Sequence, residues 1–172
     1  MRLKSTLHLF LLFTLLHTNL FAQNFWVPDA NFRNKLKQFY PGCFTAQDSM
    51  ITSCTQLQNV TVLDVSNLSI FSLNGIQYFT ALGYLSCNHN YLTNLPALPA
   101  SISNLDCSWN QLTSLPSLPG NMHGLNCSSN KINSLPALPG SLTTLDCSNN
   151  LLTSLPFIPN SVFSLECHYN HF

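Results

Sequence analysis

The sequence carries very little charge. Lysine, arginine, aspartate and glutamate make up 7% of its 172 residues, with six basic and six acidic side chains. A chain without a basic surface offers no electrostatic attraction to nucleic acid or to anionic lipid, so we expect neither as a partner. The scarcity of charge does not imply disorder, because 45% of the residues are hydrophobic and recur at regular spacing. We therefore expect a folded surface rich in serine, threonine and asparagine.

Long hydrophobic runs are also scarce, and the one that exists lies near the N-terminus. Leu7–Leu16 follows Arg2 and Lys4 and leads to a small residue, Ala22. This layout is typical of a secretory signal peptide, whereas a membrane-spanning helix needs about 20 apolar residues. We predict a signal peptide over 1–22, no membrane insertion after its cleavage, and a secreted or cell-surface location. The alternative is an uncleaved membrane anchor.

The remainder of the sequence repeats with a period of twenty residues. The recurring positions are Cys87, Cys107, Cys127, Cys147 and Cys167, then Asn90, Asn110, Asn130, Asn150 and Asn170, and the proline pairs 96/99, 116/119, 136/139 and 156/159. Four complete units run over 85–104, 105–124, 125–144 and 145–164, preceded by a 22-residue version at 63–84 and followed by a partial unit from Leu165. A fixed period of this length is typical of a repeat solenoid.

Each unit has the pattern L-x-C-x-x-N-x-L-x-x-L, the leucine-rich repeat signature with cysteine at an inward strand position. In the strand of one coil, we expect Leu105 and Cys107 to point into the core and Asp106 onto the concave face. Asn110 is expected to satisfy backbone groups of neighbouring coils. The leg 115–119 (LPSLP) cannot be helical, because proline removes amide donors and favours extended backbone. We therefore predict short parallel strands on the concave face and an extended, polyproline-like convex face.

An amphipathic helix is predicted ahead of the repeats. Phe32, Leu36 and Phe39 recur at helical spacing, and Asp29 lies in the first turn. Such a helix would form an N-terminal cap that shields the apolar edge of the first coil. The predicted domains are the signal peptide (1–22), the cap (23–62) and the leucine-rich repeat array (63–172). Because the last unit is unfinished at Phe172, we expect the chain to be part of a longer protein.

These motifs resemble those of secreted leucine-rich repeat proteins of Bacteroidota-type bacteria. The resemblance covers residues 25–172 and rests on VPDANF at 27–32, LDVS at 63–66, LNGI at 73–76 and the recurring LxCSxNxLTSLP. The proline-rich legs are also similar to the repeats of bacterial type III effectors, and the 22-residue coil is similar to internalin coils. The resemblance implies a secreted or surface-displayed interaction or adhesion module.

The cysteines fall into two groups. Five occupy one strand position in successive coils, about 4.8 Å apart, where parallel side chains are poorly placed to form a bridge. We interpret this cysteine ladder as a column of small buried thiols. Cys43 and Cys54 lie outside the ladder and are candidates for a disulfide, with two free thiols as the alternative.

No pattern of a catalytic, cofactor or metal site emerges. Cys167, His168 and His171 include a potential metal-binding pair, but alternation along a strand directs neighbouring side chains to opposite faces. A nucleophilic cysteine–histidine pair would need a third orienting group and a pocket, which the sequence does not indicate. We predict a non-enzymatic protein without cofactors.

The concave face carries an unusual share of the charge. Four of the six acidic residues of the chain occupy the outward position between the core leucine and the cysteine, and aromatic and polar residues follow nearby. This acidic column is either a binding stripe or merely the solvated face of the solenoid. The candidate ligand-binding residues are Asp64, Asn88, Asp106, Trp109, Asn126, Asp146, Glu166, His168 and Tyr169.

Two functions remain open from the sequence. The first is a secreted binding module that uses its concave face for a protein or glycan ligand, because a rigid repeat array presents many side chains at low entropic cost. The second is a structural spacer segment of a larger cell-surface adhesin.

Overall fold

The computed structural model describes residues 24–172, so the predicted signal peptide lies outside the described residues. The cap comes first. Strands β1 (Asn24–Phe25) and β2 (Met50–Ile51) pair antiparallel, and helix α2 (Ala30–Phe39), the 3-10 turn η1 (Pro41–Cys43) and the one-turn helix α3 (Thr55–Gln58) complete it. Within residues 24–172 no helix has the length and apolar character that crossing a membrane requires.

Helix α2 is held to the repeats by the residue that starts it. Asp29 is the N-cap, and its Oδ1 accepts a hydrogen bond from the Phe32 amide at 2.9 Å. Its Oδ2 accepts from the Phe71 amide at 2.7 Å and the Ser72 amide at 3.3 Å, both in the first coil. Leu36, one turn after Phe32, is fully buried like it. One carboxylate therefore starts the helix and docks it against the array.

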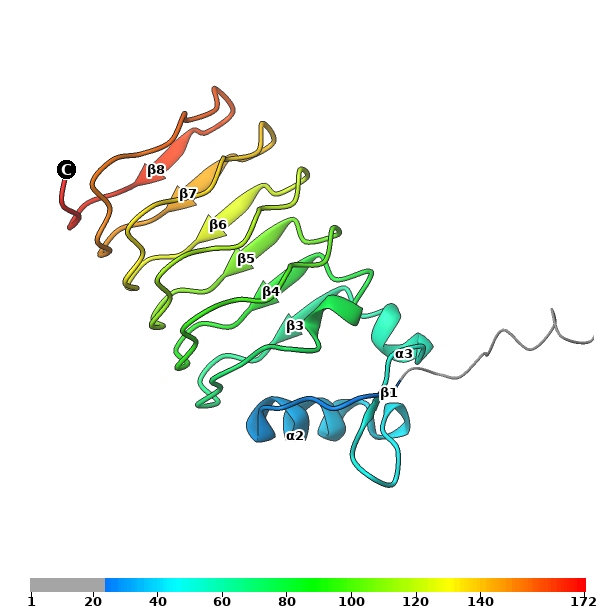
Figure 1. The fold of residues 1–172 in the computed structure, drawn as a ribbon. Coiled ribbons are helices and arrows are strands. Elements are labelled where there is room, and N and C mark those ends of the chain that lie inside the picture. Colours follow the sequence, from blue (N-terminus) through cyan, green and yellow to red (C-terminus); the bar gives the residue numbers. More distant parts are fainter. Residues whose placement is uncertain (1–23) are drawn as a thin grey trace, which may run out of the picture.

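The array is one parallel sheet of six three-residue strands. These are β3 (Val62–Asp64), β4 (Tyr84–Ser86), β5 (Asn104–Asp106), β6 (Gly124–Asn126), β7 (Thr144–Asp146) and β8 (Ser164–Glu166), with the 3-10 turn η2 (Ile76–Tyr78) between β3 and β4. Figure 1 shows the strands in a row, the cap beside β3 and the C-terminus beside β8. The return legs of the four later coils contain neither helix nor strand.

The strands pair in register, so equivalent residues of successive coils are direct neighbours. The central leucines form one column, namely Leu63, Leu85, Leu105, Leu125, Leu145 and Leu165. All are buried except Leu165 in β8, which is 40% exposed. Val65 and the cysteines from Cys87 to Cys147 form a second buried column beside them. Each coil thus buries the apolar residues of the next, as a solenoid requires.

The repeat asparagines satisfy the backbone where each strand ends. The side-chain Nδ2 of Asn110 donates to the carbonyls of Cys87, Cys107 and Ser108, and its Oδ1 accepts from the Leu92 amide. Asn90, Asn130, Asn150 and Asn170 make equivalent bonds. Two of the groups served by Asn110 belong to the preceding coil, so the predicted role of these asparagines is confirmed.

The predicted fold class is confirmed. The chain is a repeat solenoid with short parallel strands on one face, legs without helix on the other, and a helical cap at the N-terminal end. The first coil differs from the later ones, because its return leg contains η2 where the others have proline-rich extended backbone.

Candidate functional site

The strand face presents two outward columns, one on each side of the core leucines. The column after the leucine contains the predicted acidic residues. The column before it contains Val62, Tyr84, Asn104, Gly124, Thr144 and Ser164. This second column carries no charged residue and was not among the predicted candidates, although the same alternation of strand residues points both neighbours of each leucine outward.

A shallow hollow of about 280 Å³ lies between these columns over β4 to β8. It is lined by Tyr84, Asn104, Leu105, Asp106, Gly124, Leu125, Asn126, Thr144, Leu145, Asp146, Ser164 and Glu166. Gly124 lies in its floor without a side chain, and Oδ1 of Asn104 occupies the adjacent space, 2.5 Å from where a Cβ would lie. The hollow is therefore a site with a polar rim and space for a ligand group at its centre.

Two carboxylates of the hollow also have a structural role. Oδ1 of Asp106 accepts hydrogen bonds from the amide and the hydroxyl of Ser108, at 3.0 and 2.7 Å. Asp146 accepts the same pair of bonds from Ser148. Asn126 does so too with its amide oxygen, from Ser128. Since asparagine does this equally well, the turn requires an acceptor at this position but not a negative charge.

The negative charge is therefore free to serve binding. Asp106, Asp146 and Glu166 line the hollow, and no lysine or arginine does. Residues two coils apart are about 10 Å apart, so a cation bound between two of the carboxylates would lie within one Debye length, about 8 Å at physiological salt, of both. A histidine lies near the last of them, with 3.3 Å between Nδ1 of His168 and Oε2 of Glu166. The hollow is suited to a cationic group.

Asp64 lies apart from this hollow, at the cap end of the column. It lines a second depression with Lys35, Phe39, Tyr40, Val62, Leu63 and Ser66. Hydrogen bonds from Ser66, helped by the charge of Lys35, lower the pKa of the Asp64 carboxyl. Asp64 therefore belongs to the junction between cap and array rather than to the acidic hollow.

Two aromatic candidates flank the strand face and do not line its hollow. Trp109 and Tyr169 occupy the turn after each strand, with left-handed φ values of 52° and 53°, and neither lines the hollow. The chain has already turned away from the strand face three residues after the outward strand position. Asn88 and His168 lie at the margin, where Nδ2 of Asn88 donates to Oδ2 of Asp106 at 2.8 Å. Of the predicted residues, Asp106, Asn126, Asp146 and Glu166 line the hollow, and Asn88 and His168 contact it from its margin.

The two groups of cysteines have different chemistry. Cys43 and Cys54 are joined in a disulfide, whereas the five repeat cysteines are free thiols. Burial, and secondly the nearby charge of Asp106, raises the pKa of Cys87 far above its usual range. Burial likewise raises the pKa of Cys147, to about 12. A thiol that holds its proton so firmly is a poor nucleophile and a poor metal ligand.

Residues 24–172 also contain no cluster of three or more histidine, cysteine or acidic side chains that could hold a metal ion. The strand face presents hydrogen-bonding groups over several coils. Its polar groups are amides, hydroxyls and carboxylates spread over several coils, without a group poised to attack or to transfer a proton.

The fold and the repeating hydrogen bonds define the chain as a leucine-rich repeat solenoid. No family model matches its sequence, and no curated protein matches it. Among solved structures it is similar to YopM from Yersinia enterocolitica, with 39% identity and a TM-score of 0.63 over 65% of this chain and 25% of that one. The chain spans about a quarter of the length of that protein.

Two further structures extend the similarity. A Shigella effector leucine-rich repeat domain has 25% identity and a TM-score of 0.68, over 98% of this chain and 67% of that one. The functional domain of InlJ from Listeria monocytogenes, described as including a cysteine ladder, has 26% identity and a TM-score of 0.58, over 87% and 44%. The predicted similarity to effector and internalin repeats is confirmed, and the Bacteroidota-type origin stays a prediction.

Proposed function

We propose that this chain is an exported protein-binding module whose ligand places a cationic group in the acidic hollow of the strand face. The observation that carries the proposal is the set of three carboxylates, Asp106, Asp146 and Glu166, around a hollow without a basic residue. Asparagine preserves the turn at Asn126, so the fold alone does not account for the acids. The similarity to an effector repeat domain supports a role in binding rather than catalysis.

Export is supported by the chemistry of the cap. A disulfide such as Cys43–Cys54 persists in oxidising compartments and is rare in the cytosol. Together with the signal peptide predicted over 1–22, this favours a secreted or surface-displayed protein. N-terminal sequencing of the protein recovered from cells that produce it tests this. A chain that starts at Gln23 is expected, and a chain that still carries the hydrophobic run would contradict cleavage.

Selection of binders from a displayed library of random peptides tests the binding face. We expect most independent binders to carry lysine or arginine and to bind less well as salt is raised. Asp106→Asn combined with Asp146→Asn should weaken them at least about fivefold, since about 1 kcal/mol corresponds to that factor. Gly124→Gln, which adds a side chain to the floor of the hollow and displaces that of Asn104, should weaken them as well.

Ser117→Ala is the matched control, because alanine occupies the same convex position at Ala97 and Ala137. It should leave both affinity and melting temperature unchanged. Binders that ignore all of the strand-face substitutions would show that the face is only a solvated scaffold. That outcome would favour the alternative function, a spacer segment of a larger adhesin.

A further inference from the structure

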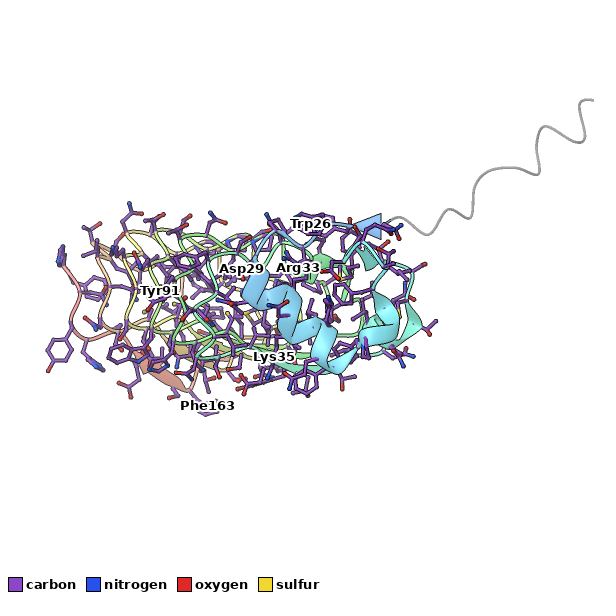
Figure 2. All side chains as sticks on the ribbon, turned by 90° about the horizontal axis from the view of Figure 1, so that it is seen from below. Trp26, Asp29, Arg33, Lys35, Tyr91 and Phe163 are labelled. Carbon is purple, nitrogen blue, oxygen red and sulfur yellow. A yellow bond between two sulfur atoms is a disulfide. The ribbon has the colours of Figure 1, made fainter. Side chains whose placement is uncertain are left out.

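A group of exposed aromatic rings lies on the turns between the strands and the return legs, away from the acidic hollow. Phe71 and Tyr91 stack with ring centroids 5.2 Å apart, and His89 and Trp109 stack at 5.3 Å with an interplanar angle of 12°. Phe71 is 64% exposed and Trp109 56%. We call these four residues the aromatic ridge. Figure 2 shows Tyr91 on the side of the array where the labelled Asp29 begins the cap helix.

The backbone conformation at His89 and Trp109 shows that the fold does not require aromatic side chains at these two positions. Both His89 and Trp109 adopt φ of 52°, a left-handed conformation that favours glycine, tolerates asparagine, aspartate and histidine, and is costly for a side chain as bulky as that of Trp109. The same turn position carries Ser129 and Asn149 in later coils, with the same φ sign. A large aromatic residue held in this conformation is an outlier of the kind that accompanies function.

The ridge borders a hollow of about 360 Å³. It is lined by Asn67, Ser69, His89, Asn90, Tyr91 and Trp109. None of these residues is acidic, lysine or arginine, in contrast to the acidic hollow. The side chain of Asn90 is hydrogen-bonded to the backbone. The side-chain amide of Asn67 and the hydroxyl of Ser69 are exposed, and neither forms a hydrogen bond to another side chain or carbonyl among residues 24–172. The hollow therefore combines aromatic faces with unused neutral donors and acceptors.

We propose that the aromatic ridge binds a neutral carbohydrate. The C–H face of a sugar ring is apolar and slightly positive. It complements the electron-rich face of the Trp109 indole that His89 leaves uncovered. Because His89 covers the other face of the indole, Asn67 and Ser69 lie beyond His89. Hydroxyls of further sugar units along the ridge would pair with the side-chain amide of Asn67, the hydroxyl of Ser69 and the imidazole of His89. A phosphorylated or sulfated ligand would need cations, and none lines the hollow. The site is separate from the acidic hollow, so it does not depend on the protein ligand proposed there.

Binding to a panel of neutral cello-, manno-, xylo- and chito-oligosaccharides, with a heparin oligosaccharide as the charged comparator, tests this. The folded chain should bind at least one neutral sugar and should not prefer heparin. Trp26 and Trp109 are the only tryptophans, so in a Trp26→Phe variant the fluorescence reports on Trp109 alone. The same neutral sugar should shift that emission, because stacking removes water from the indole.

Matched substitutions sharpen the test. Trp109→Asn installs the residue found at Asn149 and should lower the affinity for the sugar at least tenfold, with a melting temperature that is unchanged or higher. Tyr169→Asn, at the same turn position but outside the ridge, should leave the affinity unchanged. The Asp106→Asn, Asp146→Asn double variant should also bind normally, which separates this site from the acidic hollow.

Four outcomes would overturn the proposal. They are binding to none of the neutral sugars, a preference for heparin, an affinity that Trp109→Asn does not change, and a loss of affinity that Tyr169→Asn reproduces. The first would leave the ridge free for an apolar peptide, which the library selection described above would detect as binders sensitive to Trp109→Asn.

Discussion

The cap and the array both cover the apolar edge of a neighbouring coil, but they do so with different kinds of contact. The array uses one set of contacts many times, since every coil after the first repeats the leucine, the cysteine and the asparagine that bonds to its neighbour. The cap uses contacts that occur once. Asp29 joins helix α2 to the first coil, and the disulfide Cys43–Cys54 closes the segment that follows the helix. Repetition distributes stability over coils, whereas the cap concentrates it in a few bonds.

The largest effect is expected where a repeated contact is removed from the middle of the array. Leu105 is 2% exposed, and Leu105→Ala should lower the free energy of unfolding by about 2–5 kcal/mol. Asn110→Ala should lower it by about 1–3 kcal/mol, because the Leu92 amide and the Cys87 carbonyl lose a buried partner. Lys131→Ala, on an exposed turn, should change it by under about 0.5 kcal/mol. Equal denaturant midpoints for all three would contradict the register.

The next largest loss of stability is expected in the cap, when its disulfide Cys43–Cys54 is removed. The Cys43→Ala, Cys54→Ala double variant should lose about 2–4 kcal/mol, since the bond restricts the unfolded chain. Hydrogen exchange should show the loss as faster exchange in helices α2 and α3, with the strands from β5 to β7 retaining most of their protection. Uniform loss of protection through all of the coils would show that the cap and the array unfold as one unit.

The pH dependence of stability also distinguishes the cysteine ladder from the cap. Folded ladder thiols hold their protons to a higher pH than unfolded thiols, whose pKa is about 8.5. The stability that this gives is fully present below about pH 8.5 and is lost as the pH rises further, by up to about 1.4 kcal/mol per thiol and pH unit.

Denaturant titrations between pH 7 and 10 measure this loss. Cys107→Val, which copies Val65 of the first coil, should remove the contribution of one thiol and make the pH dependence shallower. A slope that Cys107→Val leaves unchanged would show that the thiols are not its source.

The smallest effect lies at the junction of the two regions. Ser66 hydrogen bonds lower the pKa of Asp64, so the stability from this carboxylate is present above its unfolded pKa and is lost as the pH falls through its folded pKa. An NMR titration of the Asp64 carboxyl should therefore give a value below that of an ordinary aspartate, and Ser66→Ala should raise it. A carboxyl that titrates identically with and without the Ser66 hydroxyl would contradict the assigned cause.

The same comparison shows what the sequence makes predictable. Leu105, Cys107 and Asn110 are predictable because the period of twenty aligns each with its neighbours, and register then fixes which backbone groups they meet. The contact between Asp29 and the first coil is not predictable. It depends on bringing residues 71 and 72 to the start of a helix 42 and 43 residues earlier in the chain. Contacts that occur once leave no periodic signal.

The candidate site is predictable to a similar extent. Strand alternation places Asp106, Asn126 and Asp146 on one face. It also places Tyr84 and Asn104 there, although neither was among the predicted site residues. The position of the Trp109 side chain cannot be predicted from strand alternation, because Trp109 lies outside the strand. It depends on a left-handed turn that the sequence motif does not reveal, because asparagine, serine, histidine, tryptophan and tyrosine all occupy it.

The measurement that tests the contrast between array and cap most directly is a count of thiols without reduction. Denatured protein should yield five reactive thiols and peptide mapping should find one disulfide, Cys43–Cys54. In the native state Cys167, the one ladder thiol that is only partly buried, should react first. The buried Cys87, Cys107, Cys127 and Cys147 should react only on unfolding. Fewer than five thiols, or a mapped bridge between any two ladder cysteines, would contradict the account.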